Sequence, residues 1–496
     1  MKMSDSRQLA PALANARRRQ VGPAVAALPM LALIAALAVA QGRGWPLYTA
    51  LVAGFAAAWA VASLLGASQR QLAEFALRGV RRVVPVLVIL ACVGAMTAAW
   101  LASGTVPGLI YYGLRLINPR ALIVAGFIIA SLTSLALGSS IGTLSTVGIA
   151  VMGIASAAGA PLPLMAGALA SGALLGDRTS PLSGTFHLTA NMTEISPDRA
   201  LRALAPSAAA AWLLSLAGFW LLGRGWRPGT SVGDAAAAAV FTRNLAANFN
   251  LSWVVLLPPV VVFALALARR PVRDSLGAGL AVGIIIALLV QHHPLSLLLQ
   301  ELVSGYALHS GVRALDSVIS GGGLVRMVNI VLLLTFAGAF SGIMESMELL
   351  EALVRPLLAR VRRPRDLLTA TMALSCLTAA IVANQVLSII IPARLVRSEY
   401  ARRRLPPEFL ARMLADSGAV ISPLIPWNLM AVISAAALGI APTAYAPYAL
   451  LMYLFPFVSL VWVWTQAERP HGAPAAAGKT SLYSAPPRAP GDSPGQ

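Results

Sequence analysis

Long apolar segments separated by short polar ones dominate the sequence. About 20 consecutive apolar residues cross a bilayer as one helix, and on that basis the chain offers roughly 11 to 13 membrane segments. The first covers about residues 24–40, after a polar and basic N-terminus at residues 1–23 that is expected to be cytoplasmic. No small-residue cleavage site follows it, so we expect a first span and not a removed signal peptide. The pattern predicts an all-α polytopic membrane protein with a transmembrane domain over residues 24–467.

The composition excludes a soluble protein of this size. Hydrophobic residues make up 58% of the 496 residues and charged residues only 11%, whereas about 25% is usual in a globular protein. The 37 basic and 18 acidic residues give a net charge of +19. Because the arginines cluster between apolar segments, positive-inside loops explain this charge better than nucleic-acid binding does. The Pro-, Ala-, Gly- and Ser-rich residues 468–496 are expected to form a disordered tail.

Two apolar segments are poor spanning helices because polar residues interrupt them. Residues 138–146 combine glycines with several hydroxyl side chains, and residues 366–392 contain Ala383-Asn384-Gln385 between two arginine-rich flanks. If both flanks are cytoplasmic, the second segment enters and returns as a hairpin, whose ~26 residues would reach about 20 Å into the membrane. A broken single span is the alternative. Interrupted backbone survives in lipid only where it lines a protein-buried cavity.

A similar motif follows each interrupted segment. The first half reads Gly-Asp-Arg-Thr-Ser-Pro-Leu-Ser over residues 176–183. The second half reads Asp-Ser-Gly-Ala-Val-Ile-Ser-Pro-Leu-Ile-Pro-Trp-Asn over residues 416–428. Each contains an acid and then Ser-Pro-Leu. Paired interruptions in corresponding positions of two halves indicate the substrate site of a secondary transporter.

The chemistry of these motifs suits a small cation. Proline after Ser180 and after Ser422 interrupts the helix and frees backbone carbonyls, and such oxygens together with hydroxyls suit Na⁺. We therefore predict a Na⁺ site at Asp177, Ser180 and Ser422, and we expect the two breaks to lie close together near the midplane. The candidate substrate- or ion-binding residues are Asp177, Ser180, Ser183, Thr185, Asn384, Gln385, Asp416, Ser422 and Asn428. The alternative is that these side chains only satisfy backbone groups at kinks.

Asp177 and Asp416 are the leading candidates for exchange chemistry, because intramembrane acids are costly and usually functional. Desolvation raises the pKa of an aspartate, so a proton can compete with a metal cation for it. The alternatives are an ion pair with Arg178 for Asp177 and a helix N-cap for Asp416. His187 is a candidate proton relay, although a structural role is the simpler interpretation.

Motifs for other chemistry are weak. The sequence has no Walker-type phosphate loop and no His-Glu-x-x-His metal motif. Cys92 and Cys376 lie in apolar stretches, which argues against a disulfide framework. Ser140 with His187 is the one pair that an intramembrane serine protease could use, and we disfavour it. We expect no enzymatic activity and no cofactor, with Na⁺ and H⁺ as the coupling ions.

Several segments taken together resemble the NhaC-type sodium/proton antiporters of the ion-transporter superfamily, which also include malate/lactate exchangers. The matching stretches are residues 104–107 with 111–113, 138–148, 176–183, 388–392 and 416–428. They keep a consistent order over about 325 residues. The resemblance implies a multi-pass secondary transporter of the bacterial inner membrane, with helical hairpins and two inverted repeats at about residues 83–223 and 325–465.

Two motifs depart from the family pattern. Where the family usually reads Ser-Pro-Leu-Ser-Asp-Thr-Thr-Asn, this chain has Gly184 for the acid and His187 for the amide, and the family's Ala-Asp-Gln contains Asn384 here. The expected function is antiport of Na⁺ or a small solute against H⁺. A carboxylate or amino-acid exchanger on the same fold and a non-transporting membrane protein are the alternatives. The expected partners are the transported ion or small molecule and the lipid bilayer, without nucleic acid, and a homodimer is left open.

Overall fold

The computed structural model describes residues 22–116, 118, 121–226, 235–350, 352–353 and 361–466. Regular structure within these ranges is helical, and β pairing there is limited to one isolated antiparallel bridge between Tyr306 and Gly321. The all-α prediction is confirmed. The predicted tail at residues 468–496 and residues 1–21 of the predicted basic N-terminus lie outside the described residues.

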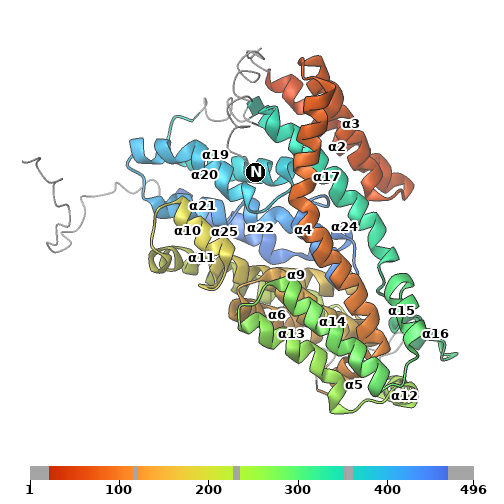
Figure 1. Ribbon diagram of the computed structural model, residues 1–496. Helices are drawn as coiled ribbons and strands as arrows, with labels where there is room; N and C mark the ends of the chain where they lie inside the picture. Colours follow the sequence, from red (N-terminus) through yellow and green to blue (C-terminus); the bar gives the residue numbers. More distant parts are fainter. Residues whose placement is uncertain are drawn as a thin grey trace, which may run out of the picture.

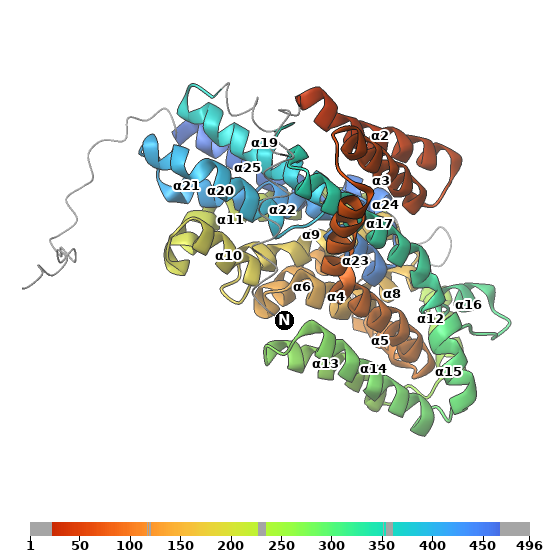
Figure 2. The same cartoon turned by 45° about the horizontal axis from the view of Figure 1, so that its top comes forward.

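The first half of the chain begins with long apolar helices and continues into the first interrupted segment (Figure 1). Its helices are α2 (Pro23–Arg43), α3 (Leu47–Leu64), α4 (Gln69–Ala102), α5 (Thr105–Leu116), α6 (Leu122–Leu137), α7 (Ser140–Thr143), the π-helical turn η2 (Leu144–Gly148), α8 (Ile149–Ala157), α9 (Leu162–Thr179), α10 (Gly184–Met192) and α11 (Pro197–Arg224). Figure 2 shows α2 and α3 side by side at one edge of the molecule, next to α17.

The second half adds a pair of connecting helices and then the second interrupted segment. Its helices are α12 (Ala235–Asn248), η3 (Trp253–Leu256), α13 (Leu257–Leu267), α14 (Val272–Leu289), α15 (Leu295–Ser304), α16 (Arg313–Val318), η4 (Val325–Met327), α17 (Val328–Ser346), α19 (Pro364–Val382), α20 (Leu387–Arg402), α21 (Pro407–Ala415), α22 (Gly418–Ile421), η5 (Ser422–Leu424), α23 (Leu429–Leu438), α24 (Pro442–Tyr445), η6 (Ala446–Tyr448) and α25 (Leu450–Gln466). α13 and α14 run side by side along the edge that lies opposite α2 and α3 in Figure 2.

Membrane crossing follows from the length and composition of these helices. Among the described residues, 8 helices are long and apolar enough to span a bilayer, or up to 11 if each of three bent helix pairs forms one span. The first of them, Pro23–Arg43, confirms the predicted first span. The predicted 11 to 13 segments therefore agree with the structure only at the lower limit, because several apolar stretches fold into half-length helices.

α4 packs along α17 through glycines that bring the two backbones together. A Cβ atom at Gly79 of α4 would collide with the carbonyl of Gly338, and one at Gly342 would collide with the carbonyl of Phe75. Small residues permit this close approach. It matters in a membrane because lipid tails are as apolar as the side chains, so the helices associate through close packing and not through the hydrophobic effect. With 34 residues, α4 extends about 50 Å, longer than a hydrocarbon core of about 30 Å.

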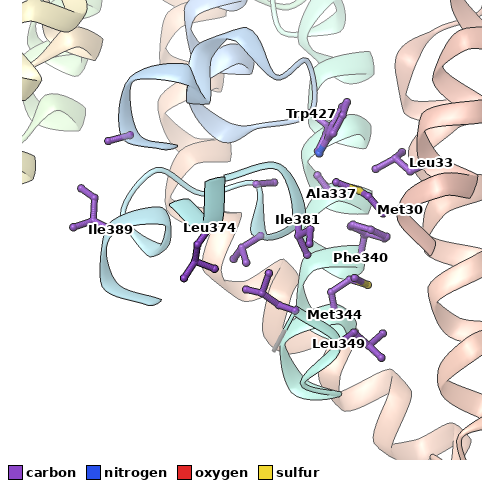
Figure 3. Close-up of a cluster of buried hydrophobic side chains, with 14 of the residues drawn as sticks. Met30, Leu33, Ala337, Phe340, Met344, Leu349, Leu374, Ile381, Ile389 and Trp427 are labelled. Carbon is purple, nitrogen blue, oxygen red and sulfur yellow. The ribbon is translucent and has the colours of Figure 1, made fainter. Parts of the chain in front are cut away.

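A buried apolar cluster joins these long helices to the second interrupted segment. Figure 3 shows Leu33 of α2, Phe340 of α17, Ile381 of α19 and Trp427 gathered in one region. Leu33, Phe340 and Ile381 are fully buried. The indole N–H of Trp427 donates to the carbonyl of Ala380 at 2.7 Å, which satisfies its one polar atom. Dense dispersion contacts of this kind fix α19 against the helices of the first half.

The segment predicted to enter and return forms a hairpin of α19 and α20. Arg403, just after α20, donates to the carbonyls of Val361 and Arg362 at 3.0 and 3.1 Å, just before α19 begins. The hydroxyls of Thr371 and Tyr400 lie 3.0 Å apart along the same pair. The two ends of the segment therefore lie together, which confirms the hairpin and makes the broken single span wrong.

The first interrupted segment also turns back on itself. α6 ends at Gly138, whose φ of 65° is left-handed, and Ser139 caps α7 by accepting the N–H of Gly142 at 3.2 Å. A Cβ at Gly126 of α6 would lie 3.3 Å from the side chain of Val151, so the chain comes back to α6 after α7, while α9 is the helix that packs along α6. The π-helical turn between α7 and α8 is a feature often found at functional sites.

Gly79→Ala is expected to lower the melting temperature of the detergent-solubilised protein by several degrees. The new methyl group must push α17 away from α4, and overpacking of this kind costs about 1 to 3 kcal/mol. Gly277→Ala in α14 is the matched control, because nothing lies within 4 Å of the added Cβ. Thermal unfolding followed by tryptophan fluorescence compares the two variants, and equal melting temperatures would contradict tight packing of α4 on α17.

Candidate functional site

Asp177 lies in the last turn of α9 and is buried, with 8% of its surface exposed. Its carboxylate faces the start of α7. The backbone N–H of Ser140 donates to Oδ1 at 3.0 Å, and the hydroxyl of the same serine donates to Oδ2. Hydrogen bonds of this kind stabilise a carboxylate without neutralising its charge.

The two other buried acids of the described residues, Asp416 and Glu301, each face a basic side chain. Arg178 donates from Nη2 to Asp416 at 2.8 Å and forms a second bond from Nε. Glu301 lies 2.7 Å from the ring nitrogen of His293. Asp177 pairs with no Arg, Lys or His among the described residues. It is therefore the one buried acid in these ranges whose carboxylate has no basic side chain as a partner.

The Arg178–Asp416 pair connects four helices. Ser207 of α11 accepts from Arg178 Nη2 at 2.7 Å and donates to Asp416 Oδ2 at 3.2 Å, and Ser459 of α25 also donates to that oxygen. The guanidinium lies 4.4 Å from the ring centre of Phe455. These contacts engage both oxygens of Asp416, so its carboxylate serves the ion pair and not an N-cap.

The serines of the first break bind backbone groups. Ser183 caps α10 by accepting the N–H of Thr185 at 3.1 Å, and its hydroxyl donates to the carbonyl of Asp177 at 2.6 Å. Ser180 donates to the carbonyl of Leu135 at 2.7 Å. Both serines are fully buried. These bonds satisfy the backbone freed by Pro181 and fix Asp177 against α6 and α10.

The second break is held in the same manner. The hydroxyl of Ser422 donates to the carbonyl of Gly418 at 2.7 Å. Asn428 caps α23 by accepting the N–H of Met430 at 3.0 Å, and its amide donates to the carbonyl of Ala379 at 2.9 Å. Ser422 and Asn428 are fully buried. That both breaks lie near the membrane midplane stays a prediction.

A small cavity joins residues from the two halves. Asp177 and Thr185 line it together with Gln385 at the tip of the second hairpin. The amide nitrogen of Gln385 donates to the carbonyl of Ala419 at 3.0 Å. The cavity measures about 10 Å³, room for about one water-sized group. The cavity thus brings Asp177 of the first half beside Gln385 of the second.

Asp177 and Thr185 also line a larger cavity of about 450 Å³. Gly184 lies in its wall, and a Cβ built there meets nothing within 4 Å. The exposed Arg269 and Arg270, between α13 and α14, line it as well. This cavity connects the buried carboxylate to a basic loop at the surface.

Two predicted residues lie away from these cavities. Asn384 accepts the N–H groups of Val386 and Leu387 at 2.9 and 3.3 Å just before α20, and it lines a separate cavity together with Arg82. His187 is exposed, and its ring nitrogen lies 2.8 Å from the carbonyl of Pro181. Neither side chain is among those that line the cavities beside Asp177.

Sequence reasoning missed Ser140 and Arg178 as functional partners. Ser140 belongs to the hydroxyl-rich stretch before α8, but nothing in the sequence relates it to Asp177, which lies 37 residues away. Arg178 was considered only as a partner for its neighbour Asp177, whereas it binds Asp416, 238 residues away. The available signal was the cost of burying an arginine, which requires an acid somewhere in the fold.

Removing one member of the buried pair should destabilise the protein more than removing both. Arg178→Leu or Asp416→Leu alone leaves an unpaired buried charge, which costs about 3 to 5 kcal/mol. The double variant removes both charges and should recover much of the loss in melting temperature. A double-mutant cycle in detergent measures this coupling, and additive losses would show that the pair is not energetically coupled.

The chain matches proteins of known class over most of its length. Residues 189–466, more than half of the chain, match the Na⁺/H⁺ antiporter family. The Na⁺/H⁺ antiporter NhaC of Bacillus subtilis is 33% identical over 384 residues, covering 77% of this chain and 84% of that protein. NhaC of Alkalihalophilus pseudofirmus is 30% identical, covering 75% and 80%. The malate-2H⁺/Na⁺-lactate antiporter of Bacillus subtilis is 27% identical, covering 82% and 87%.

These matches agree with the apolar helices, the interrupted segments and the buried carboxylate described above. The chain belongs to the Na⁺/H⁺ antiporter family and is a multi-pass secondary antiporter of the bacterial plasma membrane.

Proposed function

We propose that Asp177 is the group at which Na⁺, or another small solute, exchanges for H⁺. The observation that carries this proposal is the state of the buried acids. Asp416 and Glu301 face bases, whereas Asp177 is held only by the amide and hydroxyl of Ser140. A carboxylate in this position can bind either a proton or a cation, and that competition is the minimum requirement for antiport.

The surrounding oxygens fit a small hard cation. Na⁺ prefers carboxylate, hydroxyl and carbonyl oxygens, and Thr185 and Gln385 bring such atoms to the small cavity beside Asp177. Among the described residues, no three His, Cys, Asp or Glu side chains gather as a transition-metal site would require. The names of the two NhaC relatives support Na⁺ as the transported cation.

Ser140 would tune the competition between proton and cation. Burial favours the neutral, protonated form of an aspartate, whereas donors to the carboxylate favour the charged form. The two donors of Ser140 therefore stabilise the charged form of Asp177, which has no ion pair with a base among the described residues. Asp416 has no place in the proposed binding centre, because Arg178 already neutralises it.

The two hairpins provide the elements that would alternate access. Each half has an interrupted helix beside a hairpin tip. Asp177 binds Ser140 of the first tip and lines the small cavity together with Gln385 of the second. We propose that the halves are the inverted repeats at about residues 83–223 and 325–465. Rocking of one repeat against the other would then expose Asp177 to either side of the membrane.

An organic-acid exchanger on the same fold is the second candidate. The cavity beside Asp177 is lined by Arg269 and Arg270, whose positive charges would attract an anion and repel a cation. The name of the malate-2H⁺/Na⁺-lactate relative shows that a similar chain handles carboxylates together with Na⁺. Uptake of labelled Na⁺, malate and lactate into proteoliposomes distinguishes the two candidates.

Asp177→Asn should abolish exchange while the protein still folds. Asparagine keeps the size and hydrogen bonding of the side chain but cannot exchange a proton for a cation. Glu399→Gln is the matched control, because Glu399 pairs with Arg402 and Arg403 at the exposed end of α20. Na⁺-driven proton movement in proteoliposomes should fall to the level of empty liposomes for Asp177→Asn only. Normal pH-dependent exchange by well-folded Asp177→Asn would contradict the proposal.

Gly184→Asp should raise the apparent affinity for Na⁺ by about tenfold or more, because a second carboxylate in the cavity contributes about 1 to 3 kcal/mol net. The structure leaves open space for this side chain. Asn384→Asp restores the other family acid but lies in the separate cavity, so it serves as the matched control. Na⁺ titration of exchange in both variants measures the effect, and equal affinities would refute the role of position 184.

A further inference from the structure

The same backbone contact occurs once in each half of the chain. Gly176 donates its N–H to the hydroxyl of Ser134 at 3.0 Å, and Gly418 donates its N–H to the hydroxyl of Ser375 at 3.1 Å. At both glycines a Cβ atom would collide with the carbonyl of the partner serine. The two contacts thus define which residues of the two halves correspond, and they do so without relying on sequence similarity.

By this correspondence the two Ser-Pro breaks occupy equivalent positions in the two halves, whereas the two acids do not. Ser180 and Ser422 each follow their glycine by four residues. The residue directly after the glycine is Asp177 in the first half but Ala419 in the second. Asp416 precedes Gly418 and is not the counterpart of Asp177. The acids that appear to pair in the sequence motifs therefore occupy different places.

The hairpin tips follow the same correspondence. Gly138 and Ala383 end their helices with left-handed φ angles of 65° and 54°, and each is followed by a capping residue. The next residue is Ser140 in the first half, which binds the carboxylate of Asp177, and Gln385 in the second, which binds the carbonyl of Ala419. Each half thus joins its hairpin tip to the residue after its glycine.

Both halves contribute residues to one cavity. Asp177 of the first half lines the small cavity together with Gln385 and Ala419 of the second. Its one other charged lining residue is Arg178, which Asp416 neutralises. Arg412 contacts the ring of Trp462 and the carbonyl of Ala203 and is not among the lining residues. Among the residues that line the cavity, Asp177 is therefore the one charged side chain without an ion-pair partner.

We infer that Gln385 and Ala419 form a second half-site that lacks a carboxylate, so that one monovalent cation exchanges for one proton. This inference rests on the proposed exchange at Asp177 and adds its stoichiometry and the valence of its substrate. The carboxyl proton leaves Asp177 on one side of the membrane and the cation takes its place, and the reverse occurs on the other side. The residue at position 419 therefore determines whether the binding centre has one carboxylate or two.

The charge of the loaded centre explains why the exchange is electroneutral. Protonated Asp177 is neutral, and Asp177 with one Na⁺ is neutral as well, so both loaded forms carry the same charge across the membrane. A divalent cation would leave one positive charge in a buried site, which is unfavourable. The membrane potential acts only on net charge that moves, and it should therefore have no effect on the rate.

The first test measures exchange under an imposed potential. Proteoliposomes with valinomycin and a K⁺ gradient of either sign should show the same initial rate of Na⁺-driven proton movement, and Ca²⁺ should not drive exchange. A rate that changes severalfold with the sign of the potential would overturn the inference while leaving exchange at Asp177 intact. Absence of any cation–proton exchange would instead overturn the proposed function and the inference together.

The second test supplies the missing carboxylate. Ala419→Asp should make exchange dependent on potential, or let Ca²⁺ drive it with at least tenfold higher affinity than in the parent. Ala419→Asn, of equal size and without charge, should do neither. Because Ala419 is buried, Gln385→Glu supplies the charge at the same cavity if Ala419→Asp does not fold. A folded charged variant with electroneutral, Ca²⁺-insensitive exchange would show that the second unit is not a half-site.

Discussion

The buried ion pair between Arg178 and Asp416 determines what the neighbouring carboxylate can do. It connects α9 and α11 of the first half with α21 and α25 of the second. Because each charge satisfies the other, neither must be compensated by the transported ion, and Asp177 next to the arginine keeps its own charge free. The free-energy cost of desolvating two ions is recovered only when further hydrogen bonds fix their geometry. Ser207 and Ser459 donate such bonds to Asp416.

Interrupted helices are tolerated here because side chains replace the missing backbone hydrogen bonds. Hydrocarbon offers no partner to a free carbonyl or amide, so every break must be satisfied within the protein. Ser183 and Asn428 cap the helices that follow the breaks, while Ser134 and Ser375 hold the helices that precede them. The hydroxyl groups thus have a structural role, and only the break beside Asp177 adds an ionisable group to it.

The two positions at which this chain lacks an acid of the family pattern lie in different surroundings. Gly184 lies in the wall of the cavity beside Asp177, where an acid would add charge directly to the site. Asn384 accepts two backbone N–H groups just before α20, a task that an aspartate performs equally well, and it lines another cavity beside Arg82. The replacement at position 184 therefore changes the charge beside Asp177, and the replacement at position 384 changes the charge at the start of α20.

The sequence by itself determined the class of the protein and the segments that matter. Apolar length, the scarcity of charge and the positions of Pro and Gly follow from local chemistry, so the membrane helices, the second hairpin and both Ser-Pro breaks could be read from it. Only the tertiary structure decided the partners. It pairs Arg178 with Asp416 and Ser140 with Asp177, and it gives Gly176 and Gly418 the same contact with a serine hydroxyl. Hydrogen bonds and ion pairs between residues 37 to 238 positions apart depend on how helices pack, and no local pattern encodes that arrangement.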